Sequence, residues 1–203
     1  MPQARSTLKN MGGSSLVPDN LALIAIGGNL PSDAGDPVRT IAAALQQFEA
    51  FDLHLRAVSA FYRTPCFPPG SGPDYVNAAV TVSTSLSATA ILDALHAVEA
   101  HFGRRRLQRW GRRTLDLDLV AVGDSVAPDS GTQNAWRGLP LDEQMNKAPS
   151  ELVLPHPRLQ DRGFVLVPLA DIAIGWVHPL VNQSVGQMLH ALPETAREEV
   201  KKL

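Results

Sequence analysis

An alternating run of leucines and aspartates places the sharpest constraint on the fold. Leu115, Leu117 and Leu119 alternate with Asp116 and Asp118. Because neighbouring side chains of a β-strand point to opposite faces, the leucines can enter a core while both carboxylates share the other face. At about 3.3 Å of rise per residue, the two aspartate Cα atoms lie roughly 6 to 7 Å apart. The run therefore predicts a strand with one buried face and a pair of carboxylates on the other.

A segment rich in arginine precedes this strand. From Gly103 to Thr114 the chain is G-R-R-R-L-Q-R-W-G-R-R-T, with Trp110 among the arginines. Guanidinium groups can hold a phosphate through two parallel hydrogen bonds, and tryptophan supplies a flat face and one N–H. The carboxylates of the following strand can converge on one hard cation or bridge two. Together the two halves favour a site for magnesium and a polyphosphate.

Each half also has an ordinary explanation. A D-x-D pattern on an alternating strand is usually a solvated polar face, and an arginine run usually faces solvent or nucleic acid. Considered as one unit, however, R-W-G-x-R-T-L-D-L-D closely resembles the signature of the 6-hydroxymethyl-7,8-dihydropterin pyrophosphokinase family of the folate pathway. The length of this motif makes chance a poor explanation.

The composition is that of one globular domain. The chain has 203 residues, 44% of them hydrophobic, and a formal net charge of −2, so the arginine cluster is a local feature. Its one cysteine, Cys66, excludes an internal disulfide and fits a cytoplasmic location. Residues 1–20 lack the apolar centre of a signal peptide, and no run approaches membrane-spanning length. We expect a disordered tail over residues 1–20 and a single domain over residues 21–203.

The remaining patterns predict an α+β fold. The expected elements are a strand at 21–26, a helix at 37–48 capped by Asp36, strands at 53–62 and 75–84, a helix from Ser87 to Phe102, and the leucine–aspartate strand. Strand, helix, strand, strand, helix, strand is the β-α-β-β-α-β order of the ferredoxin-like fold, an antiparallel sheet with helices on its faces.

Two segments are expected outside this core. Residues 123–154 form an insertion, which we predict to be partly ordered because it contains Trp136. C-terminal additions follow, namely a short strand around Trp176 and Val177, a helix from Ser184 and a charged tail.

Two further blocks carry the same resemblance, F-Y-R-T-P-C-F-P-P-G-S-G-P-D-Y-V-N-A-A-V and L-P-H-P-R-L-Q-D-R-G-F. In the first block, Tyr75 and Asn77 share a strand face. A tyrosine ring can stack on a heterocycle, and an asparagine amide offers a donor and an acceptor side by side. The alternative is an exposed pair on a sheet face. The chain departs from the family pattern at Pro68, Arg112, Glu151 and Val153.

The resemblance implies the site residues. The catalytic positions are Arg104, Arg113, Asp116 and Asp118, and the two aspartates are also the metal ligands. The ATP-binding positions are His96, Glu99, Arg106, Arg109, Trp110, Arg113, Leu119, His156 and Arg162. The pterin-binding positions are Thr64, Pro65, Phe67, Tyr75, Asn77, Trp110 and Phe164.

The resemblance also implies a function. A member of this family would transfer pyrophosphate from ATP to 6-hydroxymethyl-7,8-dihydropterin and leave AMP, with two Mg²⁺ ions held by the aspartates. We expect ATP and the reduced hydroxymethylpterin as partners, no nucleic acid, no membrane, a monomer and a cytoplasmic location. The alternative is a ferredoxin-like module that binds single-stranded RNA. The sequence lacks the aromatic motifs of such modules, and the two carboxylates would repel a phosphate backbone unless metal neutralised them.

Overall fold

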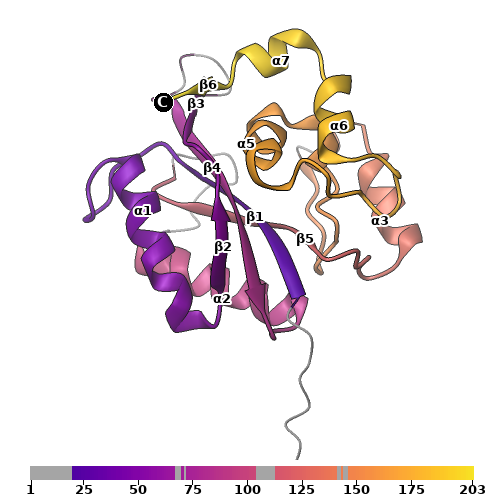
Figure 1. The fold of residues 1–203 in the computed structure, drawn as a ribbon, viewed down its shortest axis with the longest axis horizontal. Coiled ribbons are helices and arrows are strands. Elements are labelled where there is room, and N and C mark those ends of the chain that lie inside the picture. Colours follow the sequence, from indigo (N-terminus) through magenta and orange to yellow (C-terminus); the bar gives the residue numbers. More distant parts are fainter. Residues whose placement is uncertain (1–19, 67–69, 71, 104–112, 141–142, 144–145) are drawn as a thin grey trace, which may run out of the picture.

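The protein folds as an α+β structure in the computed structural model, which describes residues 20–66, 70, 72–103, 113–140, 143 and 146–203 (Figure 1). The strands are β1 Asn20–Gly28, β2 His54–Val58, β3 Tyr62–Thr64, β4 Tyr75–Thr84, β5 Asp116–Val122 and β6 Lys201–Lys202. The helices are α1 Pro37–Gln47, α2 Ala88–His101, α3 Ser130–Arg137, α5 Gly163–Ala173, α6 Val185–Ala191 and α7 Glu194–Glu198, with short 3-10 turns at Phe48–Phe51 and Leu159–Asp161.

The strands form one antiparallel sheet. Its order is β5-β1-β4-β3-β6, and β2 pairs with β4 beside β3. This arrangement, with α1 and α2 in the connections, confirms the predicted ferredoxin-like fold. The aspartates therefore lie on β5, next to β1, and Tyr75 and Asn77 begin β4.

One predicted strand is in fact two. We expected a single strand over 53–62, but the chain leaves the ladder between β2 and β3 at Ser59. The Ser59 hydroxyl accepts the Ala79 N–H at 2.9 Å, which replaces a backbone ladder partner. The Ala60 N–H is donated instead to the Asp171 carboxylate at 3.0 Å. Side-chain oxygens that compete for backbone donors explain the break, and no periodicity in the sequence reveals it.

The two helices predicted from their caps are confirmed. Asp36 accepts the Arg39 N–H at 2.9 Å at the start of α1, where Pro37 takes the first helical position. Ser87 accepts the Ala90 N–H at 3.2 Å at the start of α2. Both side chains satisfy donors that have no partner within the helix.

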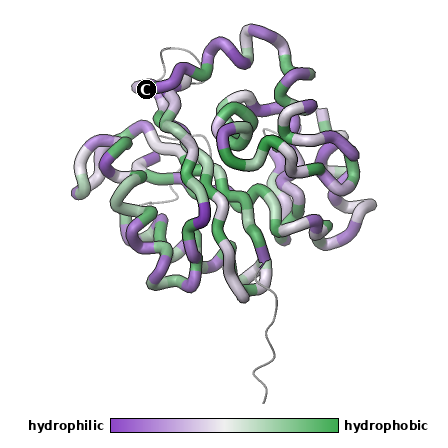
Figure 2. Tube along the Cα trace, in the orientation of Figure 1, coloured by the Kyte–Doolittle hydropathy of each residue, from purple (hydrophilic) through white to green (hydrophobic). Residues whose placement is uncertain are grey.

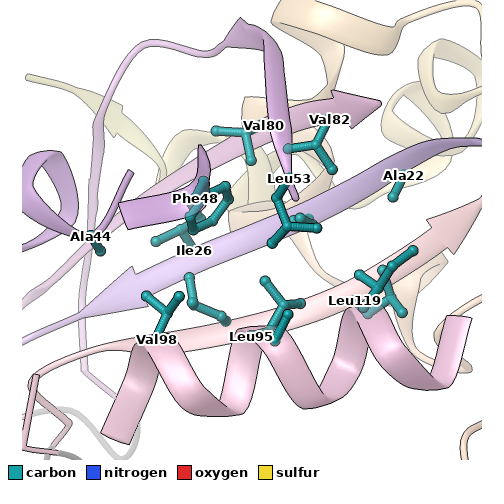
Figure 3. Close-up of a cluster of buried hydrophobic side chains, with 14 of the residues drawn as sticks. Ala22, Ile26, Ala44, Phe48, Leu53, Val80, Val82, Leu95, Val98 and Leu119 are labelled. Atoms are coloured by element: carbon teal, nitrogen blue, oxygen red, sulfur yellow. The ribbon is translucent and has the colours of Figure 1, made fainter. Parts of the chain in front are cut away.

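The sheet is covered on both faces. On one face, side chains of β1, β4 and β5 pack against α1 and α2, with Phe48 and Leu95 fully buried (Figure 3). On the other face, a second core that includes Leu23 and Ala79 packs against α5 and α6. Figure 2 shows that the hydrophobic residues are concentrated in the strands and in α5. Because both faces of the sheet are covered, β4 is buried along almost its whole length.

The region after β5 differs from its prediction in several places. The insertion contains α3, so its predicted partial order is confirmed. The helix from Ser184 is also confirmed as α6, which begins with a capping box between Ser184 and Gln187. The strand expected around Trp176 is wrong, because only an isolated bridge joins Val177 to Ser184. Where we expected a charged tail, the structure has α7 and β6, and α5 was not predicted at all.

Within the described residues, no helix is both long and apolar enough to cross a membrane.

Candidate functional site

A row of paired residues crosses the sheet from the aspartates to the start of β4. The residues there, Thr64, Pro65, Tyr75 and Asn77, are called the tyrosine block below. Asp116 of β5 pairs with Gly27 of β1, Gly27 with Asn77 of β4, and Asn77 with Tyr62 of β3. Directly paired residues share a face, so these side chains lie on the face that α5 covers further along. Strands are about 4.8 Å apart, which places Asp116 and Asn77 roughly 10 Å from each other. The backbone of Gly27 forms the floor between them.

The surroundings of Gly27 leave little room for a side chain. A Cβ atom there would lie 3.0 Å from Asn77 Oδ1, tighter than most real contacts. Its neighbour Gly28 is more restricted, because a Cβ would lie 2.6 Å from the Thr114 carbonyl oxygen. The G-G pair of β1 thus allows the Asn77 side chain and the chain at Thr114 to approach the strand closely. Both glycines belong to β1 and not to a loop.

Asn29 fixes the segment that leads into β5. Its Oδ1 accepts the Arg113 N–H at 3.0 Å, its own N–H is donated to the Arg113 carbonyl at 2.9 Å, and its Nδ2 is donated to the Pro73 carbonyl at 3.2 Å. Asn29 is 4% exposed, so these bonds are shielded from water. One side chain therefore ties Arg113 to the loop before β4. We did not predict this residue, although its place directly after G-G was a visible signal.

Each aspartate of β5 faces an arginine. The Arg113 guanidinium forms an ion pair with Asp116 Oδ2, and Arg162 Nη1 lies 4.0 Å from Asp118 Oδ2. Burial lowers the pKa of Arg113, but the charge and the hydrogen bond of Asp116, together with the charge of Asp118, outweigh it, so the pKa is raised. Burial lowers the pKa of Arg162, although Asp118 opposes this effect. Both guanidinium groups stay protonated at neutral pH.

The carboxylates suit magnesium. Mg²⁺ prefers oxygen ligands and is commonly held by one or two protein carboxylates together with phosphate oxygens and water. Asp116 and Asp118 supply such a pair from one strand face, with side-chain exposures of 19% and 40%. No cluster of three or more acidic, histidine or cysteine side chains that could bind a metal occurs among the described residues. The donor set therefore fits an ion that also takes ligands from a bound phosphate.

Glu99 supports the strand from beneath. It is 1% exposed on α2, and its Oε1 accepts the Leu117 N–H at 2.7 Å. Leu117 lies between the two aspartates, so Glu99 fixes the backbone that carries them. His96, the other α2 residue with an expected ATP contact, is partly buried one turn earlier. The Leu119 side chain is 4% exposed in the core, which leaves only its backbone for a ligand.

The tyrosine block lies close to the arginines. Asn77 is 5% exposed, and its Nδ2 is donated to Thr64 Oγ1 at 2.8 Å, so the exposed pair considered above is wrong for Asn77. Tyr75 is half-buried opposite Thr64. Burial raises the pKa of Tyr75, while the charge of Arg113 lowers it and that of Asp116 raises it again. The ring thus lies near the Arg113–Asp116 pair. Pro65 is exposed at the end of β3.

The chain after the insertion passes along the free edge of β5. The His156 N–H is donated to the Val120 carbonyl at 2.8 Å, and His156 Nδ1 accepts the Arg158 N–H at 3.1 Å. Burial, and then the charges of Arg162 and Arg158, lower the pKa of His156 to about 3. The imidazole is therefore neutral at pH 7, and its Nε2 carries the proton.

Arg162 and Phe164 flank the first residue of α5. The Phe164 ring is 39% exposed, and the Arg162 guanidinium lies 5.4 Å from its centroid in a cation–π arrangement. One residue pair thus offers an aromatic face and a positive charge beside the aspartates.

Five of the expected site residues lie outside the described residues. They are Phe67, Arg104, Arg106, Arg109 and Trp110. The other expected positions lie on β3, β4, α2, β5 and the segment 156–164, except Pro65, which follows β3, and Arg113, which precedes β5. Arg113 pairs with Asp116, and Arg162 lies near Asp118. The charge of Arg162 acts on His156, and that of Arg113 acts on Tyr75.

The sheet is ferredoxin-like, and on it two carboxylates lie between arginines, beside a tyrosine and an amide. These features define a class of protein that can hold a metal-bound phosphate next to a planar ligand. Comparison with known proteins identifies the family. The model of the 7,8-dihydro-6-hydroxymethylpterin-pyrophosphokinase family matches residues 23–174.

Two curated relatives are named 2-amino-4-hydroxy-6-hydroxymethyldihydropteridine pyrophosphokinase. The protein from Synechocystis is 36% identical over 176 residues, which cover 86% of this chain and 77% of the relative. The protein from Haemophilus influenzae is 36% identical over 159 residues, 78% of this chain and 84% of the relative. The chain therefore belongs to the 7,8-dihydro-6-hydroxymethylpterin-pyrophosphokinase family.

A solved structure has the same fold. Wild-type HPPK-DHPS from Plasmodium falciparum aligns with a TM-score of 0.58 at 14% identity, over 87% of this chain and 45% of that one. This chain thus spans less than half of that longer protein, and the likeness concerns the fold alone.

Proposed function

We propose that this protein is the pyrophosphokinase that transfers the terminal pyrophosphate of ATP to the hydroxymethyl oxygen of 6-hydroxymethyl-7,8-dihydropterin, with AMP as the other product. Family membership and the names of the relatives support this activity. The observation that carries it is the position of Asp116 and Asp118, which lie between Arg113 and Arg162 on the sheet face shared with Asn77.

The arginines and the aspartates divide the work at the phosphate end. Arg113 and Arg162 are partly buried cations, so they can hold phosphate oxygens in an environment where charge is weakly screened. Asp116 and Asp118 would hold Mg²⁺, for which we propose two ions, and bound Mg²⁺ would neutralise the phosphates and the charge that develops at the attacked phosphorus. Arg104, Arg106 and Arg109 are proposed as further phosphate ligands.

The pterin end is assigned to the tyrosine block and α5. Tyr75 and Phe164 are proposed as the stacking rings, and Pro65, Phe67 and Trp110 as further pterin ligands. The hydrogen bond to Thr64 orients the Asn77 amide, so that its Oδ1 remains directed over Gly27 towards the site. A fixed amide can recognise the edge of a heterocycle at a small entropic cost.

The neutral His156 is proposed as an ATP ligand. Its low pKa, about 3, keeps it uncharged beside the two arginines, so it can donate one hydrogen bond without adding repulsion. His96, Glu99 and the Leu119 backbone complete the proposed nucleotide side, and Glu99 acts by fixing β5. We further propose a cytoplasmic monomer with a single domain over residues 21–203. The tail proposed over residues 1–20 lies outside the described residues, except for Asn20, which begins β1.

The RNA-binding alternative is not supported. Such modules stack bases on an open sheet face, whereas here α5 and α6 pack against the face that carries Asn77 and Ala79, and the other face holds the main core.

A thermal-shift titration tests the proposed function. MgATP and the reduced hydroxymethylpterin should each raise the melting temperature, and the shift should grow with ligand concentration, because each binds only the folded protein. A single-stranded RNA oligonucleotide at the same concentration should leave it unchanged. Stabilisation by the oligonucleotide without stabilisation by pterin would contradict the proposal.

A further inference from the structure

The last ten residues connect two parts of the site that are far apart in sequence. Helix α7 packs against α5, and β6 pairs with β3, so that Lys202 lies opposite Tyr62 and Lys201 opposite Arg63 (Figure 1). The Leu203 N–H extends this pairing to the Phe61 carbonyl at 2.9 Å. The segment 194–203 follows the range that the family model matches, which ends at residue 174.

Its contact with α5 is at Gly163. A Cβ on Gly163 would lie 2.3 Å from the Ala196 carbonyl oxygen and 3.6 Å from Val200 Cγ2. Only a glycine allows the backbones to approach so closely. The residues on either side of Gly163 are Arg162 and Phe164, so α7 packs directly under the turn that presents the guanidinium and the aromatic ring.

The contact of residues 194–203 with β3 affects the other side of the proposed pterin site, where Thr64 and Asn77 lie. β3 has three residues, and Thr64 at its end holds the Asn77 amide at 2.8 Å. Without β6, this short strand would be paired on one side only, and short edge strands open easily. Lys201 and Glu198 also line a hollow together with Pro65 and Asp74, which flank the loop between β3 and β4.

A second tie joins the same two elements. The buried Tyr62 hydroxyl is donated to Asp171 Oδ2 on α5 at 2.9 Å, and the Ala60 N–H is donated to the same oxygen at 3.0 Å. Burial, together with this carboxylate, raises the pKa of Tyr62 to about 12, so the hydroxyl stays a donor at neutral pH. α5 and β3 are thus held together by one side-chain bond and by the C-terminal segment.

We propose that residues 194–203 are a positioning element that sets the distance between Phe164 on α5 and the Thr64–Asn77 pair at β3, and thereby the affinity for the pterin. The inference takes its ligand, the pterin, from the proposed function. The claim that residues 194–203 hold β3 in place relative to α5 does not depend on that function. If the segment only stabilised the fold, its loss would lower the melting temperature and leave the ratio of the pterin and ATP affinities of the folded protein unchanged.

Two variants separate these possibilities. Gly163→Ala places a methyl group against the Ala196 carbonyl without removing any hydrogen bond or charge. A chain that ends at Pro193 removes the segment outright. Gly186→Ala is the matched control, because its Cβ would lie 3.1 Å from Ile174 at a packed site on α6.

The first readout is the dissociation constant for each ligand, measured well below the melting temperature. Gly163→Ala and the truncation should weaken pterin binding about tenfold, which corresponds to about 1.4 kcal/mol, and should weaken MgATP binding far less. Gly186→Ala should leave the ratio of the two constants at its wild-type value. Equal weakening of both ligands, or the same change in Gly186→Ala, would overturn the proposal.

The second readout needs no ligand. Cys66 is the only cysteine, lies two residues after Thr64, and is 6% exposed with its thiol directed to the Gly72 carbonyl. Release of β3 should speed thiol labelling of Cys66 by about tenfold relative to Gly186→Ala, because local opening exposes it. Unchanged labelling would overturn the inference. If the wild-type protein failed to bind pterin, the proposed function would fall, and Cys66 labelling would still decide on the positioning element.

Discussion

At the scale of single residues, the two aspartates and the residues around them carry most of the proposed chemistry. The alternation of leucine and aspartate predicted both carboxylates and their shared face, because the period of a strand is two. The same reasoning could not reveal Asn29 or the Tyr62–Asp171 bond. Those contacts join positions 84 and 109 residues apart, and no local pattern encodes them.

Replacement of either aspartate by asparagine tests the metal assignment. Asp116→Asn and Asp118→Asn each remove a negative charge from the proposed Mg²⁺ site and preserve the side-chain shape. Several kcal/mol of transition-state stabilisation are at stake, so kcat should fall by about 10²- to 10⁴-fold. Steady-state assays across a magnesium series provide the measurement. Near wild-type turnover in both variants would refute the assignment.

The two variants should differ in stability. Asp116 pairs closely with the partly buried Arg113, whereas Asp118 lies 4.0 Å from Arg162. Loss of the Asp116 carboxylate leaves the charge of Arg113 less compensated than loss of Asp118 leaves that of Arg162. Asp116→Asn should therefore lower the free energy of unfolding by about 1 kcal/mol more than Asp118→Asn. Urea denaturation without magnesium measures this difference, and the reverse order would count against the ion-pair geometry.

Gly27 is the second test at this scale. In Gly27→Ala, the added methyl group would lie 3.0 Å from Asn77 Oδ1 and displace the amide. Pterin affinity should drop by roughly 5- to 10-fold, since about 1 kcal/mol is typical of a weakened hydrogen bond. MgATP affinity should stay close to the wild-type value. Gly175→Ala, where a Cβ meets open space, is the control, and an unchanged pterin affinity in Gly27→Ala would exclude Asn77 from recognition.

At the scale of elements, caps and periodicity predicted α1, α2, β1, β4 and α6, whereas the C-terminal half of the fold was largely missed. The helix α5 contains Pro168 and is apolar around most of its circumference, so it lacks the one-sided stripe that marks a surface helix. The division between β2 and β3 depends on Ser59 and Asp171, which act through tertiary contacts. Long-range contacts, not local propensity, decided these elements.

The insertion 123–154 should be peripheral to the chemistry. Its ends are joined by paired backbone hydrogen bonds between Ala127 and Leu154 at 2.9 and 3.0 Å. The side-chain amide of Gln133 on α3 donates a hydrogen bond to the Pro155 carbonyl at 3.1 Å. Replacement of residues 139–150 by a Gly/Ser linker keeps all of these contacts, and loop length alone changes the closure free energy by about 0.6 kcal/mol per doubling. Turnover should stay within about twofold of wild type. If the linker variant folded but had no activity, residues 139–150 would have to be part of the site.

At the scale of the whole molecule, a buried histidine, His178, contributes to the dependence of stability on pH. His178 is fully buried in the segment between α5 and α6, and its Nδ1 accepts the N–H groups of Leu180 and Val181. Burial, and then the charge of Arg137, lower its pKa to about 4. Between the ordinary pKa of 6.5 and this value, the unfolded chain binds a proton that the folded chain does not. Stability must therefore fall as the pH falls through that range.

His178→Asn tests this linkage, because the asparagine Oδ1 can accept the same backbone donors without titrating. Between pH 6.5 and pH 5, the wild-type protein should lose about 1 to 2 kcal/mol more unfolding free energy than the variant. Urea denaturation at the two pH values measures both losses. Equal losses in the two proteins would show that His178 does not contribute.

The identity of the nucleotide product tests the central proposal most directly. The protein is incubated with ATP, magnesium and the reduced hydroxymethylpterin, and the nucleotides are separated as the reaction proceeds. AMP should appear in equal amount to the pterin consumed, because the β- and γ-phosphates leave together, and Asp118→Asn should slow its appearance without changing the product. ADP as the main product would instead show transfer of a single phosphoryl group and would contradict the pyrophosphokinase assignment.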